Sequence, residues 1–185
     1  MADFLTISHA SKDFGAWKKA YDADAPNRAL AGLTEVLLVR GVDNPNAIGL
    51  IFSLADRAKA KAFATSDRLR QAMAGAGILG VPEMTIRQGG YTPNTASLYL
   101  ALTCKVSGID KFREGFTMDA AERKAASLTD LGVMQNVDNP NDLFLIWSVG
   151  DQARATAFLS SPELAEHQIK NAGIVSKPDV HFWRR

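Results

Sequence analysis

The chain has 185 residues, of which 46% are hydrophobic and 22% are charged, and its formal net charge at pH 7 is +1. This composition is ordinary for a globular protein, and the small net charge argues against a strongly electrostatic partner such as nucleic acid or an anionic membrane surface. With one cysteine, Cys104, no secretory signal and no apolar run of roughly 20 residues, we expect a cytoplasmic protein without a disulfide or a membrane span.

The first predicted element is a short apolar strand, Phe4–Ala10. A helix should follow it, because Phe14, Trp17 and Tyr21 are spaced i, i+3 and i+7 and form one apolar stripe. Pro26 predicts the end of that helix at the preceding residue, since proline lacks the backbone N–H and restricts the residue before it.

Two strands, Leu33–Arg40 and Ala47–Leu54, should come next and form a hairpin. The segment that joins them, Asp43–Asn46, reads Asp-Asn-Pro-Asn. This tetrad favours a turn, because Asp and Asn side chains bond nearby backbone groups and proline fixes φ.

An alanine-rich helix in two pieces is predicted after the hairpin. Asp56 and Ser66 stand where N-cap residues belong, which places the pieces at about 56–64 and 66–76. The unit then closes with a helix stop at Gly77 and a last strand over Met84–Gln88.

The second half of the chain repeats the first at an offset of 95 residues. Val42–Phe63 and Val137–Phe158 share 13 identical pairs among 22. The first strand recurs as Leu98–Lys105, and Phe112 and Phe116 stand where the first copy has its aromatic stripe. The second copy has no proline after that stripe, so we expect its helix to continue for a turn or more.

Each copy has the order β-α-β-β-α-β, the ferredoxin-like arrangement, with expected boundaries at 1–92 and 93–185. Alternation along the third strand puts Ile48 and Leu50 on one face and Gly49 and Ile51 on the other, so neither face is polar. A sheet with one face in water should alternate apolar and polar residues, so the second face needs a cover, and the matching sheet of the other copy can supply it. The predicted fold class is α+β, with two tandem ferredoxin-like repeats forming one pseudo-dimeric α/β barrel.

These features resemble a known superfamily. A strand ending in His9, a helix carrying Trp17 and Tyr21, the Asp43–Asn46 hairpin and the alanine-rich helix after Asp56 are similar to the dimeric α/β barrels, here in a fused form. Members of that superfamily include antibiotic-biosynthesis-type monooxygenases, polyketide cyclases, muconolactone isomerases and stress-responsive barrel proteins. Because the resemblance is one of fold, it implies architecture more than activity.

Two histidines are the candidate catalytic residues, because an imidazole can shuttle protons near neutral pH. His9 ends the first strand, and His181 lies in the last strand. Their counterparts in the other copy are Cys104 and Thr85, so both positions break the repeat. The alternatives are a strand-end His9 bonded to local backbone and sequence drift at both positions.

The candidate ligand-binding residues fall into three groups. Small hydroxyl and aromatic side chains on the expected inner sheet face suit a pocket for an apolar ligand, or they fill the space between sheets. The aromatic stripe of the first helix walls a ligand site or belongs to the core. An arginine four residues after an aspartate in each copy reaches a substrate carboxylate or enolate, or forms a helix-surface ion pair. In that order, these residues are Ser8, Tyr99 and Thr103; Trp17 and Tyr21; and Arg28 and Arg123.

The chain contains no Gly-rich phosphate loop after a strand, no Cys-x-x-Cys, no His-x-x-x-His and no nucleophile elbow, so we expect no metal, nucleotide or other cofactor. Two functions stay open. One is a cofactor-independent enzyme of the monooxygenase, isomerase or cyclase type that acts on an apolar or aromatic metabolite. The other is a non-catalytic barrel that binds a small ligand or a protein. The chain should be a monomer with an internal pseudo-dimer, or a dimer of barrels.

Overall fold

The computed structural model describes residues 1–185 and contains eight helices and eight strands. They form two compact units, Met1–Gly89 with Trp183–Arg185, and Gly90–Phe182. The same order of elements occurs in both halves of the chain. In the first half the elements are β1 (Ala2–Ser11), α1 (Phe14–Ala23), α2 (Ala25–Leu30), β2 (Leu33–Gly41), β3 (Ala47–Leu54), α3 (Arg57–Ala64), α4 (Asp67–Gly75) and β4 (Ile78–Tyr91).

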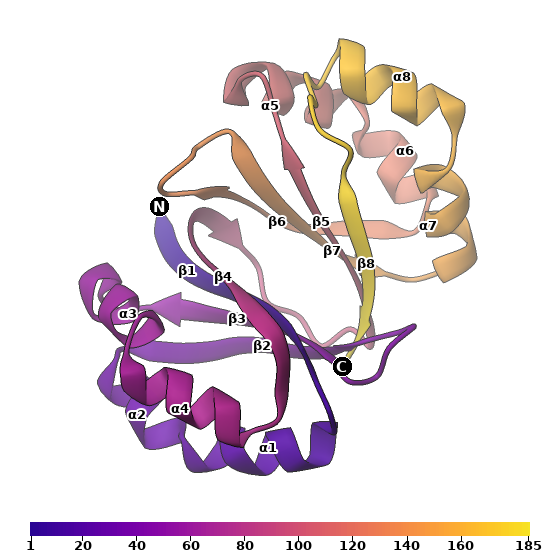
Figure 1. Cartoon of the computed structure of the whole chain (residues 1–185). Helices are drawn as coiled ribbons and strands as arrows, with labels where there is room; N and C mark the ends of the chain where they lie inside the picture. Colours follow the sequence, from indigo (N-terminus) through magenta and orange to yellow (C-terminus); the bar gives the residue numbers. More distant parts are fainter. The chain divides into compact units, whose positions relative to one another are not determined.

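The first unit is an antiparallel sheet in the order β2-β3-β1-β4, with its four helices on one face (Figure 1). Ile48, Leu50 and Phe52 of β3 project toward these helices and pack with Leu5 and Trp17 in one buried cluster. The helix-facing half of the predicted alternation along β3 is therefore confirmed.

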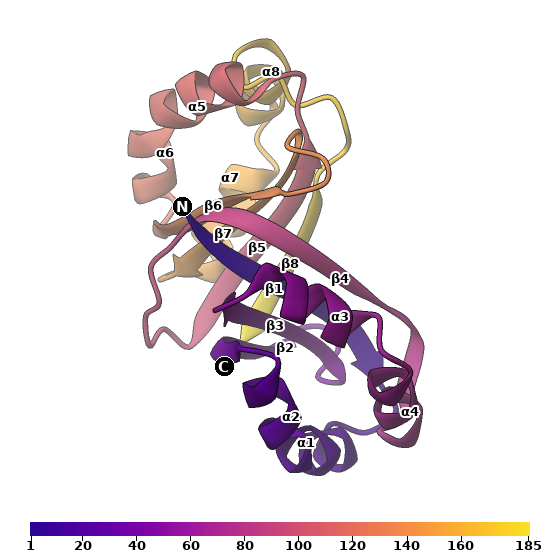
Figure 2. The same cartoon turned by 90° about the vertical axis from the view of Figure 1, so that its left-hand side faces the viewer.

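The elements of the second half are β5 (Leu98–Lys105), α5 (Ile109–Met118), α6 (Ala120–Ala125), β6 (Leu128–Asn136), β7 (Asp142–Val149), α7 (Gln152–Leu159), α8 (Pro162–Lys170) and β8 (Asp179–Arg184). The second unit has the corresponding strand order, β6-β7-β5-β8, and its four helices also cover one face (Figure 2). Leu143, Leu145 and Trp147 of its third strand pack with Leu100 and Phe112 in the equivalent cluster.

The predicted caps explain where the paired helices begin. The side chains of Asp56 and Ser66 accept hydrogen bonds from the backbone N–H groups of Lys59 and Leu69, at the starts of α3 and α4. Each cap satisfies one of the N–H groups that the first helical turn leaves without a partner. After α4 the chain turns at Gly77, whose φ of 71° favours glycine.

The prediction that the helix of the second copy continues further is wrong. α1 is followed by a separate α2 in the first unit, and α5 is followed by α6 at the same point of the second unit, where no proline is present. In each unit an arginine of the shorter helix donates from Nη1 to a carbonyl in the last turn of the longer helix, Arg28 to Tyr21 and Arg123 to Phe116, both at 2.5 Å. The same bond occurs in both units although only the first contains a proline, so the break does not depend on Pro26.

β4 is longer than the predicted strand Met84–Gln88 and is irregular beside His9. Ser8 pairs with Glu83 and Ala10 pairs with Leu79, so the register between β1 and β4 shifts at His9. Gly80, in the extra segment of β4, has a φ of 70°. Bulges of this kind change the direction of nearby side chains and are frequent beside functional sites.

Candidate functional site

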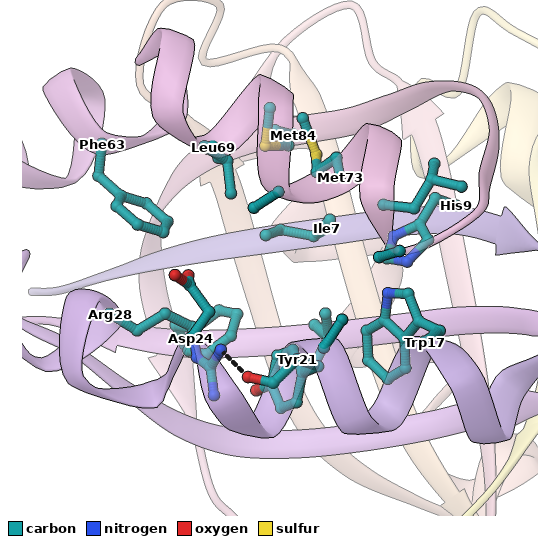
Figure 3. Close-up of a pocket in the computed structure, with 16 residues that line it drawn as sticks. Ile7, His9, Trp17, Tyr21, Asp24, Arg28, Phe63, Leu69, Met73 and Met84 are labelled. Atoms are coloured by element: carbon teal, nitrogen blue, oxygen red, sulfur yellow. Dashed lines mark hydrogen bonds between the residues drawn. The ribbon is translucent and has the colours of Figure 1, made fainter.

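A pocket lies in the first unit between the helix-facing side of the sheet and the helices that cover it. It encloses a cavity of about 80 Å³. Figure 3 shows His9 and Trp17 at one end and Asp24 and Arg28 at the other. The walls between these ends are apolar and come from β1, β3, α3, α4 and β4; they include Ile7, Leu50, Phe52, Phe63, Leu69, Met73, Ile78 and Met84.

His9 is the unusual group in this pocket. Both of its ring nitrogens are shielded from solvent, and neither has a hydrogen-bond partner. Its ring lies 5.4 Å from that of Trp17, between centroids. Burial lowers the pKa of His9 to about 4, so the imidazole is neutral at pH 7 and can still accept a proton or a hydrogen bond. The alternative of a histidine bonded to local backbone does not describe this side chain.

Trp17, Tyr21 and Arg28 form a stack along one wall. The rings of Trp17 and Tyr21 are 4.7 Å apart between centroids, and the Arg28 guanidinium carbon lies 3.6 Å from the Tyr21 centroid. The Tyr21 hydroxyl donates a hydrogen bond to the Glu35 carboxylate. Burial, followed by this bond, raises the pKa of Tyr21, so its hydroxyl stays a donor. The Arg28 guanidinium therefore lies on the face of the Tyr21 ring, where a cation–π interaction stabilises it.

Asp24 does not form the helix-surface ion pair with Arg28 that its spacing predicts. It accepts from Arg68 at 3.1 Å and from the Asn27 amide at 2.6 Å. Arg28 instead bends back to the carbonyl of Tyr21. The helix break at Asp24 explains the difference, because residues four apart are neighbours only on a continuous helix.

The second unit holds an equivalent but smaller pocket, of about 50 Å³. Phe112 and Phe116 stand in place of Trp17 and Tyr21, and Cys104 stands in place of His9. The second pocket therefore keeps the aromatic wall and lacks the imidazole.

Arg123, the counterpart of Arg28, is fully engaged. Its guanidinium donates from Nε and Nη2 to the two carboxylate oxygens of Asp130, at 2.8 Å each, and from Nη1 to the Phe116 carbonyl. The Trp147 indole N–H also donates to Asp130, at 2.6 Å. The Arg123 side chain is only 6% exposed. A buried arginine with every nitrogen bonded in this way is typical of a structural role.

Asp119, the counterpart of Asp24, faces a histidine. Its carboxylate lies 3.1 Å from Nε2 of His167, which also contacts the Gly115 carbonyl. Burial raises the pKa of Asp119, and the neighbouring His167 opposes that shift. The first unit has Ala72 in place of His167, and Arg68 of α4 pairs with Asp24 instead, at 3.1 Å.

The structure thus brings His9, Trp17, Tyr21 and Arg28 into one pocket and places Arg123 in the other. The remaining predicted site residues lie elsewhere. Ser8 and Thr103 alternate along their strands with pocket-lining neighbours, so they point to the other sheet face. On that face, Ser8 donates to Glu83, while Tyr99 is buried and donates to the carbonyl of Asn94. His181 is exposed on β8, 3.0 Å from Asp179.

Several residues of the first pocket were missed at the sequence level. Leu69 and Met73 are spaced i, i+4 on α4, which marks them as one apolar stripe and could have placed them here. Nothing local marks Glu35 as the partner of Tyr21, because the contact joins α1 to β2 and α2 lies between them in the chain. No group of three or more acidic, histidine or cysteine side chains is arranged to hold a metal ion.

No family model and no curated protein matches the chain. Solved structures do resemble it. An anthrone oxidase-like protein aligns with a TM-score of 0.69 and 8% identity over 99% of this chain and 90% of its own. A candidate monooxygenase from Fusobacterium nucleatum aligns with a TM-score of 0.60 and 9% identity over 99% and 91%. Another, from Lactobacillus acidophilus, aligns with a TM-score of 0.57 and 12% identity over 99% and 93%.

Identities this low show the fold alone. Because the alignments run along the whole chain, they confirm the predicted fold class and the resemblance to dimeric α/β barrels built from ferredoxin-like halves. No helix of the chain is long and apolar enough to cross a bilayer.

Proposed function

We propose that the protein binds an apolar or aromatic metabolite in the pocket of the first unit and removes a proton from it with His9. The observation that carries this proposal is the imidazole of His9, neutral and without a hydrogen-bond partner, at the end of an apolar cavity. A buried polar group without a partner is unfavourable in a protein that has no use for it. A ligand polar group at that end of the pocket would supply the partner.

The reaction would begin at an acidic C–H bond beside a carbonyl. His9 takes the proton, and the bonding electrons stay on the substrate as an enolate. The negative charge then favours the protonated imidazole, so the pKa of His9 rises as the charge develops. Return of the proton at another carbon gives an isomerase, and attack on an internal carbonyl gives a cyclase. Addition of the enolate carbon to dioxygen gives a peroxide, which loses water and keeps one oxygen atom as a new carbonyl, the outcome of a monooxygenase. None of these starting steps needs a resident cofactor.

Two of the similar solved structures are named monooxygenases and a third is named anthrone oxidase-like, which supports the oxygen-dependent branch. The mostly apolar lining of the pocket also supports a second candidate, a protein that binds a ligand without converting it. An apolar cavity of about 150 Å³ holds benzene, so the pocket must widen to take an aromatic ring. Met73 and Met84 are the walls that can move, because methionine is unbranched and flexible.

Phenylpyruvate is a suitable probe for proton removal, because its benzylic carbon is acidic and its ring is apolar. We expect the protein to accelerate exchange of the benzylic protons in deuterium oxide, as followed by proton NMR. Replacing His9 by Gln should reduce the acceleration at least about 100-fold, a typical contribution of one general base. His181→Gln, on the exposed last strand, is the matched control and should leave the rate unchanged.

Exchange that is unchanged in His9→Gln would contradict the catalytic role of His9. Exchange at the rate of free solution, with phenylpyruvate bound to the protein, would favour the non-catalytic candidate instead. The proposal also includes a cytoplasmic location, which the single buried thiol of Cys104 supports. Both the monomer and the dimer of barrels stay compatible with it.

A further inference from the structure

We infer that the ligand of the first pocket carries a carboxylate, and that Arg28 binds it through Nε and Nη2. This inference rests on the proposed function and names the substrate class for the same pocket. Arg28 lines the pocket and donates only from Nη1, to the carbonyl of Tyr21. The two nitrogens that form the fork of the guanidinium have no acceptor in the protein.

The second unit shows what that fork binds when a carboxylate is present. Arg123 keeps the two contacts that Arg28 makes, a bond from Nη1 to a helix carbonyl and a stack on an aromatic ring at 3.6 Å. In addition, its Nε and Nη2 hold the two oxygens of Asp130 at 2.8 Å. A guanidinium and a carboxylate match in this paired geometry. At Arg123 the carboxylate comes from Asp130 of the protein. At Arg28 we assign the carboxylate to the ligand.

The first unit does have an acidic residue at the position of Asp130. Glu35 is paired with Phe52 in the β2–β3 ladder, as Asp130 is paired with Trp147 between β6 and β7. Glu35 accepts from the hydroxyl of Tyr21, however, and forms no ion pair with Arg28 within 4.0 Å.

Two differences between the copies account for the open fork. Tyr21 has a hydroxyl that holds Glu35, whereas Phe116 has none to hold Asp130. Trp147 has an indole N–H that orients Asp130 toward Arg123, whereas Phe52 has none to orient Glu35. Sequence differences at these two positions therefore keep the Arg28 guanidinium available, whereas that of Arg123 is bound to Asp130.

The other acidic group of the pocket does not prevent a carboxylate from binding. Asp24 already accepts from Arg68 and from the amide of Asn27, so its charge is partly balanced within the protein. The arrangement in Figure 3 then fits a ligand with a carboxylate near Arg28, an apolar body along Ile7 and Met73, and its reactive carbon near His9.

The test compares two probes of equal shape, 3-phenylpropionate and 3-phenylpropionamide, by isothermal titration calorimetry. In the native protein we expect the acid to bind at least about tenfold more tightly than the amide, as one charge-assisted pair allows. Arg28→Gln should bring the ratio close to one. Arg123→Gln is not a suitable control because it breaks a buried network, so Arg113→Gln, an exposed residue of α5, serves instead.

A second pair of variants tests how the fork is kept open and does not depend on Arg28 itself. Tyr21→Phe should free the Glu35 carboxylate to pair with Arg28. The affinity for 3-phenylpropionate should then fall about fivefold, with little effect on the affinity for the amide. Adding Glu35→Gln to Tyr21→Phe should restore the affinity for 3-phenylpropionate, because the competing carboxylate is then absent. Circular dichroism melts confirm that each variant is folded.

The outcomes separate the two proposals. Binding of neither probe would contradict the proposed function of the pocket. Binding of both probes with equal affinity would contradict only the carboxylate inference, and so would an acid-to-amide ratio that survives Arg28→Gln. A Tyr21→Phe variant that binds the acid as well as the native protein does would show that Tyr21 does not keep Glu35 away from Arg28, and would overturn that step.

Discussion

Replacing Arg123 by Met is expected to lower the free energy of unfolding by about 3 kcal/mol, and replacing Arg28 by Met by only about 1 kcal/mol. The two side chains share a bond from Nη1 and an aromatic stack, and those contacts are lost in both variants. Only Arg123 also holds Asp130 through two bonds. The Asp130 side chain is 47% exposed, so water relieves part of its lost pairing and limits the expected effect.

Urea unfolding followed by circular dichroism measures this difference. Met keeps the apolar stem of the arginine, so the comparison reports mainly on the guanidinium. Asp130→Asn provides a control within the same network. It should lower the free energy of unfolding by less than Arg123→Met does, because an amide still accepts one hydrogen bond. Equal losses at Arg28 and Arg123 would mean that the two pockets do not differ in the way their contacts indicate.

Gly115→Ala is expected to destabilise the protein by about 2 kcal/mol. A Cβ atom built at Gly115 would lie 2.6 Å from both the N and the Cα of Ala172, and these are backbone atoms that cannot turn aside. Overpacking of this kind costs about 3 kcal/mol, and the higher helix propensity of alanine returns about 1 kcal/mol. The close approach of α5 to the segment after α8 therefore requires glycine.

The first unit offers the matched control, because Ala20 stands at the equivalent position and lines the first pocket. Ala20→Gly should lower the free energy of unfolding by about 1 kcal/mol, which is the difference in helix propensity alone. Thermal and urea unfolding of both variants give the comparison. If Gly115→Ala is as stable as the native protein, the two elements are not in the close contact described here.

Local rules were sufficient for most of the fold. The caps at Asp56 and Ser66 and the stop at Gly77 are found in the structure, because each depends on the conformation of a few neighbouring residues. The strand Ala47–Leu54 has its predicted bounds, because it lies between a strong turn signal and an N-cap.

The same rules failed where distant contacts decide the conformation. The break before α6 lies at a bond between Arg123 and the Phe116 carbonyl, which no sequence signal for helix ends describes. β4 begins at Ile78, six residues before the predicted start, because it pairs with β1 beyond the bulge at His9. Both differences come from pairing across the chain, which overrides local propensity.

The candidate site was foreseen only in part. The aromatic and arginine positions could be found because they recur in both copies at a fixed spacing. Whether the arginine is bound to a carboxylate of the protein depends on an acidic residue of the next strand, Glu35 or Asp130. It also depends on whether the hydroxyl of Tyr21 is present to hold that carboxylate. A difference of one oxygen atom between Tyr21 and Phe116 is ordinary in sequence comparisons, and its consequence becomes visible only with the side chains in place.

Isoleucine methyl NMR tests most directly whether the first pocket, rather than the second, receives the ligand. Ile78 and Ile174 occupy equivalent positions and line the first and second pockets, and Ile7 also lines the first. On titration with 3-phenylpropionate we expect the δ1-methyl signals of Ile7 and Ile78 to shift together and to saturate, while that of Ile174 stays in place. A saturating shift of Ile174 with Ile7 and Ile78 unmoved would contradict the account.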